Sequence, residues 1–401
     1  MSAVDRLSEL RSLDLFAPSE EHRLLSETVF SFVRDEVEPQ ADTFNRDERF
    51  NLSLFRRAGE LGLLGLTVPE DEGGSGLDAV AAVIVHEALS TSDPGFCLAY
   101  LAHSMLFVNN FTQNGNASQK ARVLPKVISG DWIGGMCMTE PEAGTDVLGM
   151  RSDAVRQGDH YVLNGRKMFI TNGSIDETTL GDVFLVYAKI DGRITTFLVE
   201  KGFEGFSLGQ KLHDKLGVRA SMTAELVFDN CTIPVANLIG KEGESSKHMM
   251  RNLEIERVTL AAMSLGIALR CLEVMVSYAT QRKAFGAALA EHGQIQRHIA
   301  ESYAEFKAAR CYVYDVARRL DLRSFGNRAD ADGAKLFASR VGKDIADRAI
   351  QVLGGYGYMG EYVVERLWRD AKLLEIGGGT SEAHQKNITK DLVRMPELIR
   401  Q

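Results

Sequence analysis

The chain has 401 residues, which is too many for one typical domain and fits two or three. Its hydrophobic content of 45% and charged content of 25% are those of a soluble globular protein. The formal net charge of −9 argues against nucleic acid as a main partner, because binding to a phosphate backbone needs a basic surface.

The N-terminal sequence has neither the apolar core of a signal peptide nor the Arg- and Ser-rich composition of a transit peptide. No window approaches the uninterrupted apolar length that a membrane span requires. The five cysteines form no CxxC pair, so no metal site or redox motif is predicted, and their odd number suits a reducing compartment. We therefore expect a bacterial cytoplasmic protein, or a mitochondrial matrix protein from which a transit peptide has been removed.

Residues 1–134 are expected to form an N-terminal helical domain. Segment 69–76, PEDEGGSG, predicts a turn, because neither a Lys-Ser/Thr pair nor a strand-to-helix context marks it as a phosphate loop. Apolar residues recur at helical spacing in the other segments of this region, which are 20–37, 52–66, 79–90, 96–109 and 118–128.

Residues 135–245 are expected to form a middle β domain. Short runs rich in β-branched and aromatic residues follow one another, separated by Gly, Asn and Asp turns, and no helical pattern interrupts them. An antiparallel sheet is therefore predicted. Its runs are 160–165, 166–173, 182–190, 194–201, 205–212 and 224–234.

Residues 246–401 are expected to form a C-terminal helical domain. Its first helix is predicted over 251–285, a segment without Pro and with a single Gly, at 266, in which apolar residues recur every three, four and seven positions. The order helical, β, helical places the chain in the α+β class. The later helices are predicted over 294–321, 330–352 and 363–373, with a last one opening after Thr380.

Two stretches of the middle domain could hold a flat polar heterocycle. TEPEAGTD (139–146) offers hydroxyl and backbone N–H groups, and MFITNG (168–173) adds an aromatic ring. The alternative is a turn and a strand of any β domain. In QRKAFG (281–286), Arg282 and Lys283 could pair with phosphates, or could simply favour a helix C-terminus.

Two glycine-rich stretches lie in the C-terminal domain, QVLGGYGYMGEY (351–362) and IGGGTSE (376–382). Glycines let the backbone approach a ligand closely, and the N-terminus of the helix after Thr380 attracts anions. The alternative is that both are turns between helices. Neither is a GxGxxG segment after a strand, so a Rossmann dinucleotide site is not indicated.

The long helix carries Glu254, Glu256 and Arg257 within its apolar stripe. A carboxylate in such a stripe is costly unless something pairs with it or uses it. Positions two apart lie on different helix faces, so at most one of the two glutamates should point into a given cleft. The alternative is a surface Glu beside an Arg.

Taken together, these motifs resemble the acyl-CoA dehydrogenase family. TEPEAGTD, NGRKMFITNG, QRKAFG, QVLGGYGYMGEY, LWRDAK and GTSE occur in the family's order and spacing over essentially the whole chain. The resemblance implies a β-barrel-like middle domain, a C-terminal four-helix bundle, bound FAD and a homotetramer or dimer. It also implies α,β-dehydrogenation of an acyl-CoA thioester in fatty acid or leucine catabolism, with a hydride passing to flavin N5 and electron-transfer flavoprotein as acceptor.

Position by position, the resemblance assigns twelve residues to FAD. Phe169 stands where many members carry Trp, and Gly293 stands where the family usually has Gln, with Gln294 adjacent. Five of the twelve, between 282 and 355, would reach the FAD of a neighbouring subunit. The twelve are Met136, Met138, Thr139, Thr145, Phe169, Thr171, Arg282, Phe285, Gln351, Gly354, Gly355 and Thr380.

The position of the catalytic base is where this chain departs most informatively from the pattern of many family members. Many members carry it as the Glu of YEGTS, where this chain has Gly378. The isovaleryl-CoA and long-chain types carry it in the long helix, immediately before an Arg. That position is Glu256, before Arg257, while Glu254 falls where others hold an Asp that hydrogen-bonds CoA. The resemblance thus implies that Glu256 abstracts the α-proton and that the Gly378 N–H binds the thioester carbonyl.

A short branched acyl group such as isovaleryl is the first prediction, because Gly377 and Gly378 leave room for branching at the β-carbon. The alternatives are a dehydrogenase or oxidase of a long-chain, aromatic or carrier-protein-bound thioester. A non-catalytic flavoprotein of the DNA-associated branch is disfavoured by the acidic charge and by Glu256. The other residues assigned to substrate are Leu98, Ala102, Thr145, Glu254, Arg257, Leu260 and Leu373.

Overall fold

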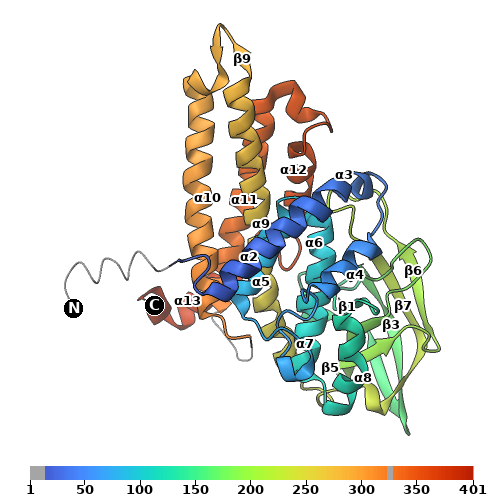
Figure 1. Ribbon diagram of the computed structural model, residues 1–401. Coiled ribbons are helices and arrows are strands. Elements are labelled where there is room, and N and C mark those ends of the chain that lie inside the picture. Colours follow the sequence, from blue (N-terminus) through green and yellow to red (C-terminus); the bar gives the residue numbers. More distant parts are fainter. Residues whose placement is uncertain (1–13, 323–327, 401) are drawn as a thin grey trace.

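The computed structural model describes residues 14–322 and 328–400 of the chain. Figure 1 shows helices from both ends of the sequence packed together, with the sheet of the middle region beside them. The predicted order of a helical, a β and a second helical region is therefore confirmed.

The N-terminal helices begin where the sequence provides caps. Ser19, Asn51, Asp78, Asp93 and Asn116 each precede a helix, and each side chain accepts a hydrogen bond from an N–H of the first turn. Two π-helical turns, Val33–Val37 and Ala102–Asn109, continue α2 and α6. The helices are α2 (Glu20–Phe32), α3 (Glu38–Arg46), α4 (Leu52–Glu60), α5 (Ala79–Ser90), α6 (Pro94–Leu101), α7 (Asn110–Asn114) and α8 (Ala117–Ile128).

The second predicted helix is shorter than expected. Helix α4 ends at Glu60 rather than at Leu66, because Gly62 adopts a φ of +76°, a left-handed conformation that stops a helix. Segment 69–76 is a turn, as predicted, and contains only the 3₁₀ turn Glu70–Glu72.

The middle region forms one eight-stranded sheet, most of whose pairings are antiparallel. Two predicted runs, 160–165 and 166–173, join into the single strand β3. The antiparallel prediction needs a correction, because β1 enters the sheet directly from α8 and pairs parallel with β4. The strands are β1 (Gly134–Cys137), β2 (Asp153–Gln157), β3 (His160–Thr171), β4 (Val183–Ile190), β5 (Arg193–Glu200), β6 (Phe206–Lys211), β7 (Thr223–Pro234) and β8 (Leu238–Ile239).

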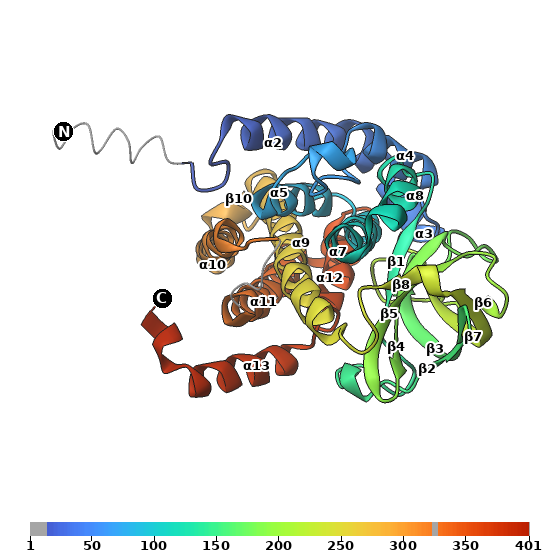
Figure 2. The ribbon, with the colours of Figure 1, turned by 90° about the horizontal axis from the view of Figure 1, so that it is seen from below.

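Three long helices form the core of the C-terminal region. Figure 2 shows α9 between α5 and α11, with α10 alongside. The first helix ends at Gln281 rather than at Phe285, and a short hairpin of β9 (Lys283–Ala284) and β10 (Ala287–Ala288) follows. The helices are α9 (Ser246–Gln281), α10 (Gly293–Arg319), α11 (Arg328–Leu353), α12 (Val364–Leu373) and α13 (Ser381–Arg394).

Helix α9 corrects the expectation that no window is apolar and long enough to cross a membrane. Among the residues of 14–322 and 328–400, it alone passes that test by length and composition. In the structure, however, 78% of its apolar window is buried inside the protein, as in the central helix of a packed core. Its apolar character is thus accounted for by contacts with α5, α10 and α11.

The single glycine of α9 marks a helix crossing. Every residue of α5 is buried, and α5 packs directly on α9. A Cβ added at Gly266 would lie only 2.2 Å from the backbone oxygen of Glu87. The absence of a side chain at position 266 therefore lets the two helices approach each other.

Gly266→Ala is expected to lower the free energy of unfolding by about 1–3 kcal/mol, because the added methyl group overpacks this crossing. Urea denaturation measures the effect. Gly293→Ala is the control, since a Cβ added at the first residue of α10 meets no atom within 4 Å. Equal denaturation midpoints for Gly266→Ala and the unmodified protein would contradict the expectation.

Candidate active site

The beginning of α9 brings a carboxylate into contact with the glycine loop before α13. Glu256 is buried, with 9% of its surface exposed, and its Oε2 atom has no hydrogen-bond partner among the described residues. A Cβ added at Gly378 would lie 3.3 Å from Glu256 Oε1. The two positions that carry the base in different branches of the resembled family are thus neighbours here.

Burial raises the pKa of the Glu256 carboxyl group, while the charges of Lys335 and Arg257 oppose this rise. A carboxylate that has a raised pKa and an oxygen without a hydrogen-bond partner is suited to accept a proton near neutral pH.

Glu254 has different surroundings, although it lies only two residues away. It is also buried, and it interacts electrostatically with Arg251 and Arg328, which are not among the groups that shift the pKa of Glu256. The two glutamates therefore lie in separate environments, which agrees with their spacing on a helix.

A buried polar network behind the glycine loop was not identified from the sequence. Lys335 of α11 is fully buried and donates hydrogen bonds to Gly377 O and Gly379 O, each at 2.6 Å. One turn earlier, Asp332 pairs with Arg257 of α9 at 3.2 Å and with His384 of α13. The sequence does contain an indication of this network, because Asp332 and Lys335 interrupt the buried alanine stripe of α11.

Apolar side chains flank the glycine loop. Leu260, one turn after Glu256, is buried, and its Cδ1 atom lies 2.2 Å from the position of a Cβ at Gly378. Leu373 Cδ1 lies 3.6 Å from a Cβ placed at Gly377. Leu98 and Ala102 come from α6 and the π-helical turn after it, both of which pack on α9.

The TEPEAGTD loop and the MFITNG stretch lie side by side. Thr139 O accepts a hydrogen bond from Met168 N at 2.9 Å, and the fully buried Lys167 donates to Met138 O at 3.1 Å. Phe169 follows at a β-bulge with a φ of +60° and is 66% exposed. A positive φ is uncommon for a non-glycine residue, and strained backbone of this kind clusters at functional sites.

A direct contact joins this part of the sheet to α9. The Asn252 amide nitrogen lies 3.5 Å from the sulfur of Met136, which is itself buried in β1. Asn252 and Glu256 are one helical turn apart and therefore share a face of α9. The loop that follows β1 thus begins close to the carboxylate.

The predicted cofactor residues between 282 and 355 lie at the other end of α9. Arg282 and Gly355 line a pocket of about 490 Å³, whose other lining residues are Tyr278, Leu289, Val352, Leu353, Tyr356 and Met359. Arg282 is 26 residues after Glu256, which corresponds to about 39 Å along a helix. A single chain therefore does not bring this group and Glu256 into one site.

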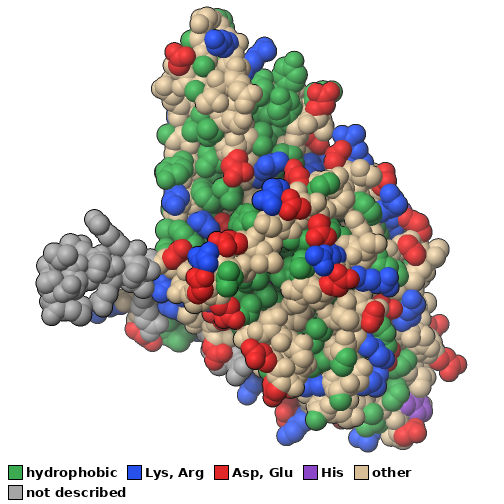
Figure 3. Space-filling view, in the orientation of Figure 1, with side chains coloured by type: hydrophobic (Ala, Val, Ile, Leu, Met, Phe, Trp, Pro, Cys, Tyr) green, Lys and Arg blue, Asp and Glu red, His purple; other side chains and the backbone are tan. Residues whose placement is uncertain are grey.

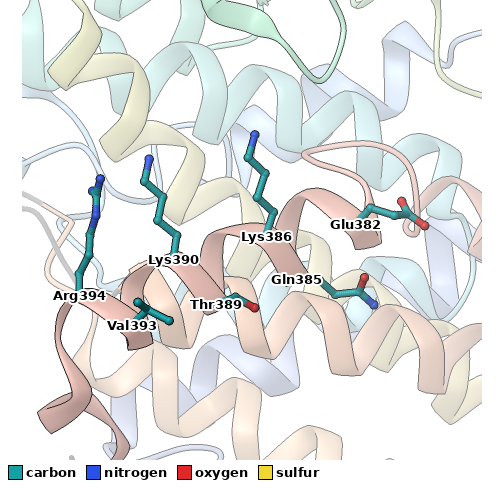
Figure 4. A pocket seen from close by; sticks show the side chains of 7 residues that line it. All are labelled: Glu382, Gln385, Lys386, Thr389, Lys390, Val393 and Arg394. Atoms are coloured by element: carbon teal, nitrogen blue, oxygen red, sulfur yellow. The ribbon is translucent and has the colours of Figure 1, made fainter.

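Thr380 is the N-cap of α13, and its hydroxyl accepts a hydrogen bond from Ala383 N. A second pocket, of about 540 Å³, runs along this helix. In Figure 4, Lys386, Lys390 and Arg394 project from the same side of α13. This pocket contains none of the residues predicted from the sequence, since its lining is Glu382, Gln385, Lys386, Thr389, Lys390, Val393 and Arg394.

Comparison with known families covers nearly the whole chain. Models of the acyl-CoA dehydrogenase N-terminal, middle and C-terminal domains match residues 19–131, 135–231 and 246–393. The chain belongs to the acyl-CoA dehydrogenase family.

Relatives agree with this assignment. Mitochondrial isovaleryl-CoA dehydrogenase of Arabidopsis thaliana is 42% identical, over 92% of this chain and 90% of its own length. The structure of butyryl-CoA dehydrogenase from Megasphaera elsdenii has a TM-score of 0.89 at 33% identity and covers 94% of this chain and 99% of its own. An acyl-CoA dehydrogenase from Bacillus anthracis, complexed with FAD, has a TM-score of 0.87 at 32% identity, over 95% of this chain and 68% of its own.

As an acyl-CoA dehydrogenase, this protein is an oxidoreductase with FAD as its cofactor. The residues near the start of α9 fit such a group. The exposed ring of Phe169 offers a face to a flat heterocycle, and the half-buried hydroxyl side chains of Thr139 and Thr171 lie on the adjoining loop and strand. Thr145, by contrast, is exposed in the structure of the isolated chain.

Proposed function

We propose that this acyl-CoA dehydrogenase oxidises a short branched-chain acyl-CoA such as isovaleryl-CoA, with Glu256 as the base that removes the α-proton. The observation that carries the proposal is the buried carboxylate of Glu256, whose Oε1 atom lies beside Gly378 and whose Oε2 atom has no partner in the described ranges. FAD, when bound, supplies the acceptor for the β-hydride.

The α-protons of a thioester are much less acidic than a carboxylic acid. A Glu can remove one only if the developing enolate is stabilised and water is excluded. Burial raises the pKa of Glu256 towards the working pH. We assign the Gly378 N–H as the hydrogen-bond donor to the thioester carbonyl. Glu254 and Arg257 are the residues that we assign to the CoA moiety.

The substrate proposal rests on the shape of the site around the loop. Gly377 and Gly378 present no side chain, and the buried Leu260 and the half-buried Leu373 pack beside them. We expect these surroundings to favour a short acyl chain branched at the β-carbon. The Arabidopsis relative, which is named for isovaleryl-CoA, supports this choice.

The proposal is tested by mixing the FAD-loaded enzyme anaerobically with isovaleryl-CoA, butyryl-CoA, palmitoyl-CoA and phenylpropionyl-CoA, and by following the bleaching of the flavin band. Isovaleryl-CoA is expected to bleach it fastest. Faster bleaching by palmitoyl-CoA or phenylpropionyl-CoA would contradict the branched-chain assignment. Rapid reoxidation of the bleached enzyme by oxygen would favour an oxidase over a dehydrogenase that reduces electron-transfer flavoprotein.

Self-association is part of the proposal, with a homotetramer as the assembly. Phe285 is 99% exposed on the β9–β10 hairpin. Tyr358, three residues after the pocket-lining Gly355, is 83% exposed. In Figure 3, hydrophobic side chains gather over the upper part of the long helices, close to this end of α9. Exposed apolar surface of this kind marks an interaction site.

The proposed location is the bacterial cytoplasm. All five cysteines are free in the structure, four of them buried, which supports a reducing compartment.

A further inference from the structure

We propose that Lys335 is a positioning residue for the reaction: it orients the glycine loop so that the Gly378 N–H faces the thioester carbonyl, and it places a positive charge near Glu256. The inference rests on the proposed roles of Glu256 and Gly378. It extends the site to α11, in which the only residue with a predicted role, Gln351, lies at the opposite end of the helix from Lys335.

The first step is the direction of a peptide group. Lys335 Nζ donates to Gly377 O at 2.6 Å, and the described residues contain no cis peptide bond. In a trans peptide the N–H points opposite to the C=O of the preceding residue. By holding Gly377 O, Lys335 therefore turns the Gly378 N–H to the opposite side of the loop.

The Gly378 N–H is left free by this arrangement. Within residues 14–322 and 328–400, no backbone or side-chain acceptor receives a hydrogen bond from it, whereas Gly377 N and Ser381 N bond to Leu373 O and Glu375 O. A donor that is fixed in direction and unused by the protein is what stabilisation of a developing oxyanion requires.

The loop needs an external support. Three successive glycines have large conformational freedom, and Gly378 and Gly379 adopt φ angles of +64° and +104°. The bonds of Gly377 N and Ser381 N fix only the two ends of this segment. Its middle is held by Lys335, which also binds Gly379 O at 2.6 Å.

The second step is electrostatic. Burial lowers the pKa of Lys335 to about 7, and the Glu256 carboxylate opposes this fall. In turn, the Lys335 cation lowers the pKa of Glu256. The charged and titratable groups that face Lys335 come from four parts of the chain and are Glu256 and Arg257 of α9, Asp332 of α11, Glu375 after α12, and His384 of α13.

Of these groups, Asp332 is already engaged by Arg257 and His384. These two contacts engage Oδ1 of Asp332, and Oε2 of Glu256 has no hydrogen-bond partner among the described residues. Loss of the Lys335 charge should therefore raise the proton affinity of Glu256, because Lys335 is the first of the two cations that lower its pKa and no described residue forms a hydrogen bond to Oε2.

Lys335→Met is the test, in the full-length, FAD-loaded enzyme. The expected result is a fall in kcat of about 10²–10³-fold, similar to the loss of an oxyanion donor. The pH at which kcat reaches half its plateau should also rise. The sign follows because activity needs the carboxylate of Glu256, and removal of a nearby cation raises its pKa. Exchange of the substrate α-proton with D₂O, followed by NMR on the reduced enzyme, should slow in parallel.

Lys215→Met is the matched control. Lys215 also donates to two backbone carbonyl groups, Val218 O at 3.0 Å and Ser221 O at 2.6 Å, but it lies in the middle region and faces Glu48 and Asp370. Its loss should lower the melting temperature without moving the acidic limb of the pH profile. If Lys335→Met moves that limb no more than Lys215→Met does, Lys335 is purely structural and the inference is wrong.

Lys335→Gln covers the case in which Lys335→Met does not fold. It keeps N–H donors for the loop but removes the charge, so kcat should partly recover while the acidic limb stays displaced. An acidic limb at the unmodified position in Lys335→Gln would overturn the electrostatic role. Failure of the proposed function is separate from these outcomes, since it would show as retained turnover in Glu256→Gln.

Discussion

Replacing Glu256 with Gln is expected to lower turnover of the acyl-CoA substrate by about 10²–10⁴-fold, while the protein stays folded and keeps its FAD. Gln matches Glu in size but cannot accept the α-proton. The substitution breaks no hydrogen bond at Oε2, because that atom already has no hydrogen-bond partner among the described residues. Steady-state turnover, the visible flavin spectrum and the melting temperature together measure the effect.

Glu254→Gln is the control for this result, because Glu254 is equally buried two residues away but faces Arg251 and Arg328. It should raise KM for the CoA thioester and leave exchange of the α-proton at a measurable rate. If Glu256→Gln retained more than about a tenth of its turnover while Glu254→Gln lost it, the base would have to be reassigned to Glu254.

The order of helices and strands could be predicted from local periodicity, and most elements follow it. The exceptions have physical causes. β1 lies in a Gly-rich segment, and β2 has only Ala154 buried, so neither shows the alternating pattern of a half-buried strand. The left-handed conformation of Gly62, which ends the second predicted helix early, depends on surrounding structure rather than on periodicity.

The residues of the candidate site also divide into those that the sequence predicts and those that depend on tertiary packing. Glu256 and Gly378 were selected by motif, but their proximity depends on how α9 packs against the loop before α13, which periodicity does not reveal. Asp332, Lys335 and His384 were missed because charged residues in a helix are usually at its surface. Their burial is a tertiary property, created where α9, α11 and α13 meet.

A second large effect on activity is expected when the catalytic carboxylate is moved from position 256 in α9 to position 378 in the glycine loop. The double change Glu256→Ala with Gly378→Glu is expected to remain almost inactive, although a Cβ at 378 lies 3.3 Å from the present Glu256 Oε1. One obstacle is Leu260, whose Cδ1 atom would lie 2.2 Å from that Cβ. The other is the φ of +64° at position 378, which costs a residue with a side chain about 1–2 kcal/mol.

Adding Leu260→Ala should therefore raise kcat at least about tenfold over the double variant, because it removes the steric obstacle while the smaller backbone penalty remains. The change also opens a cavity that lowers stability by about 2–5 kcal/mol, so all rates are compared at a temperature where each variant retains FAD. Leu260→Ala alone, with Glu256 in place, controls for effects of the cavity on substrate binding. Equal activity of the double and triple variants would mean that the loop moves away from α9, and that Leu260 does not decide where the base can be placed.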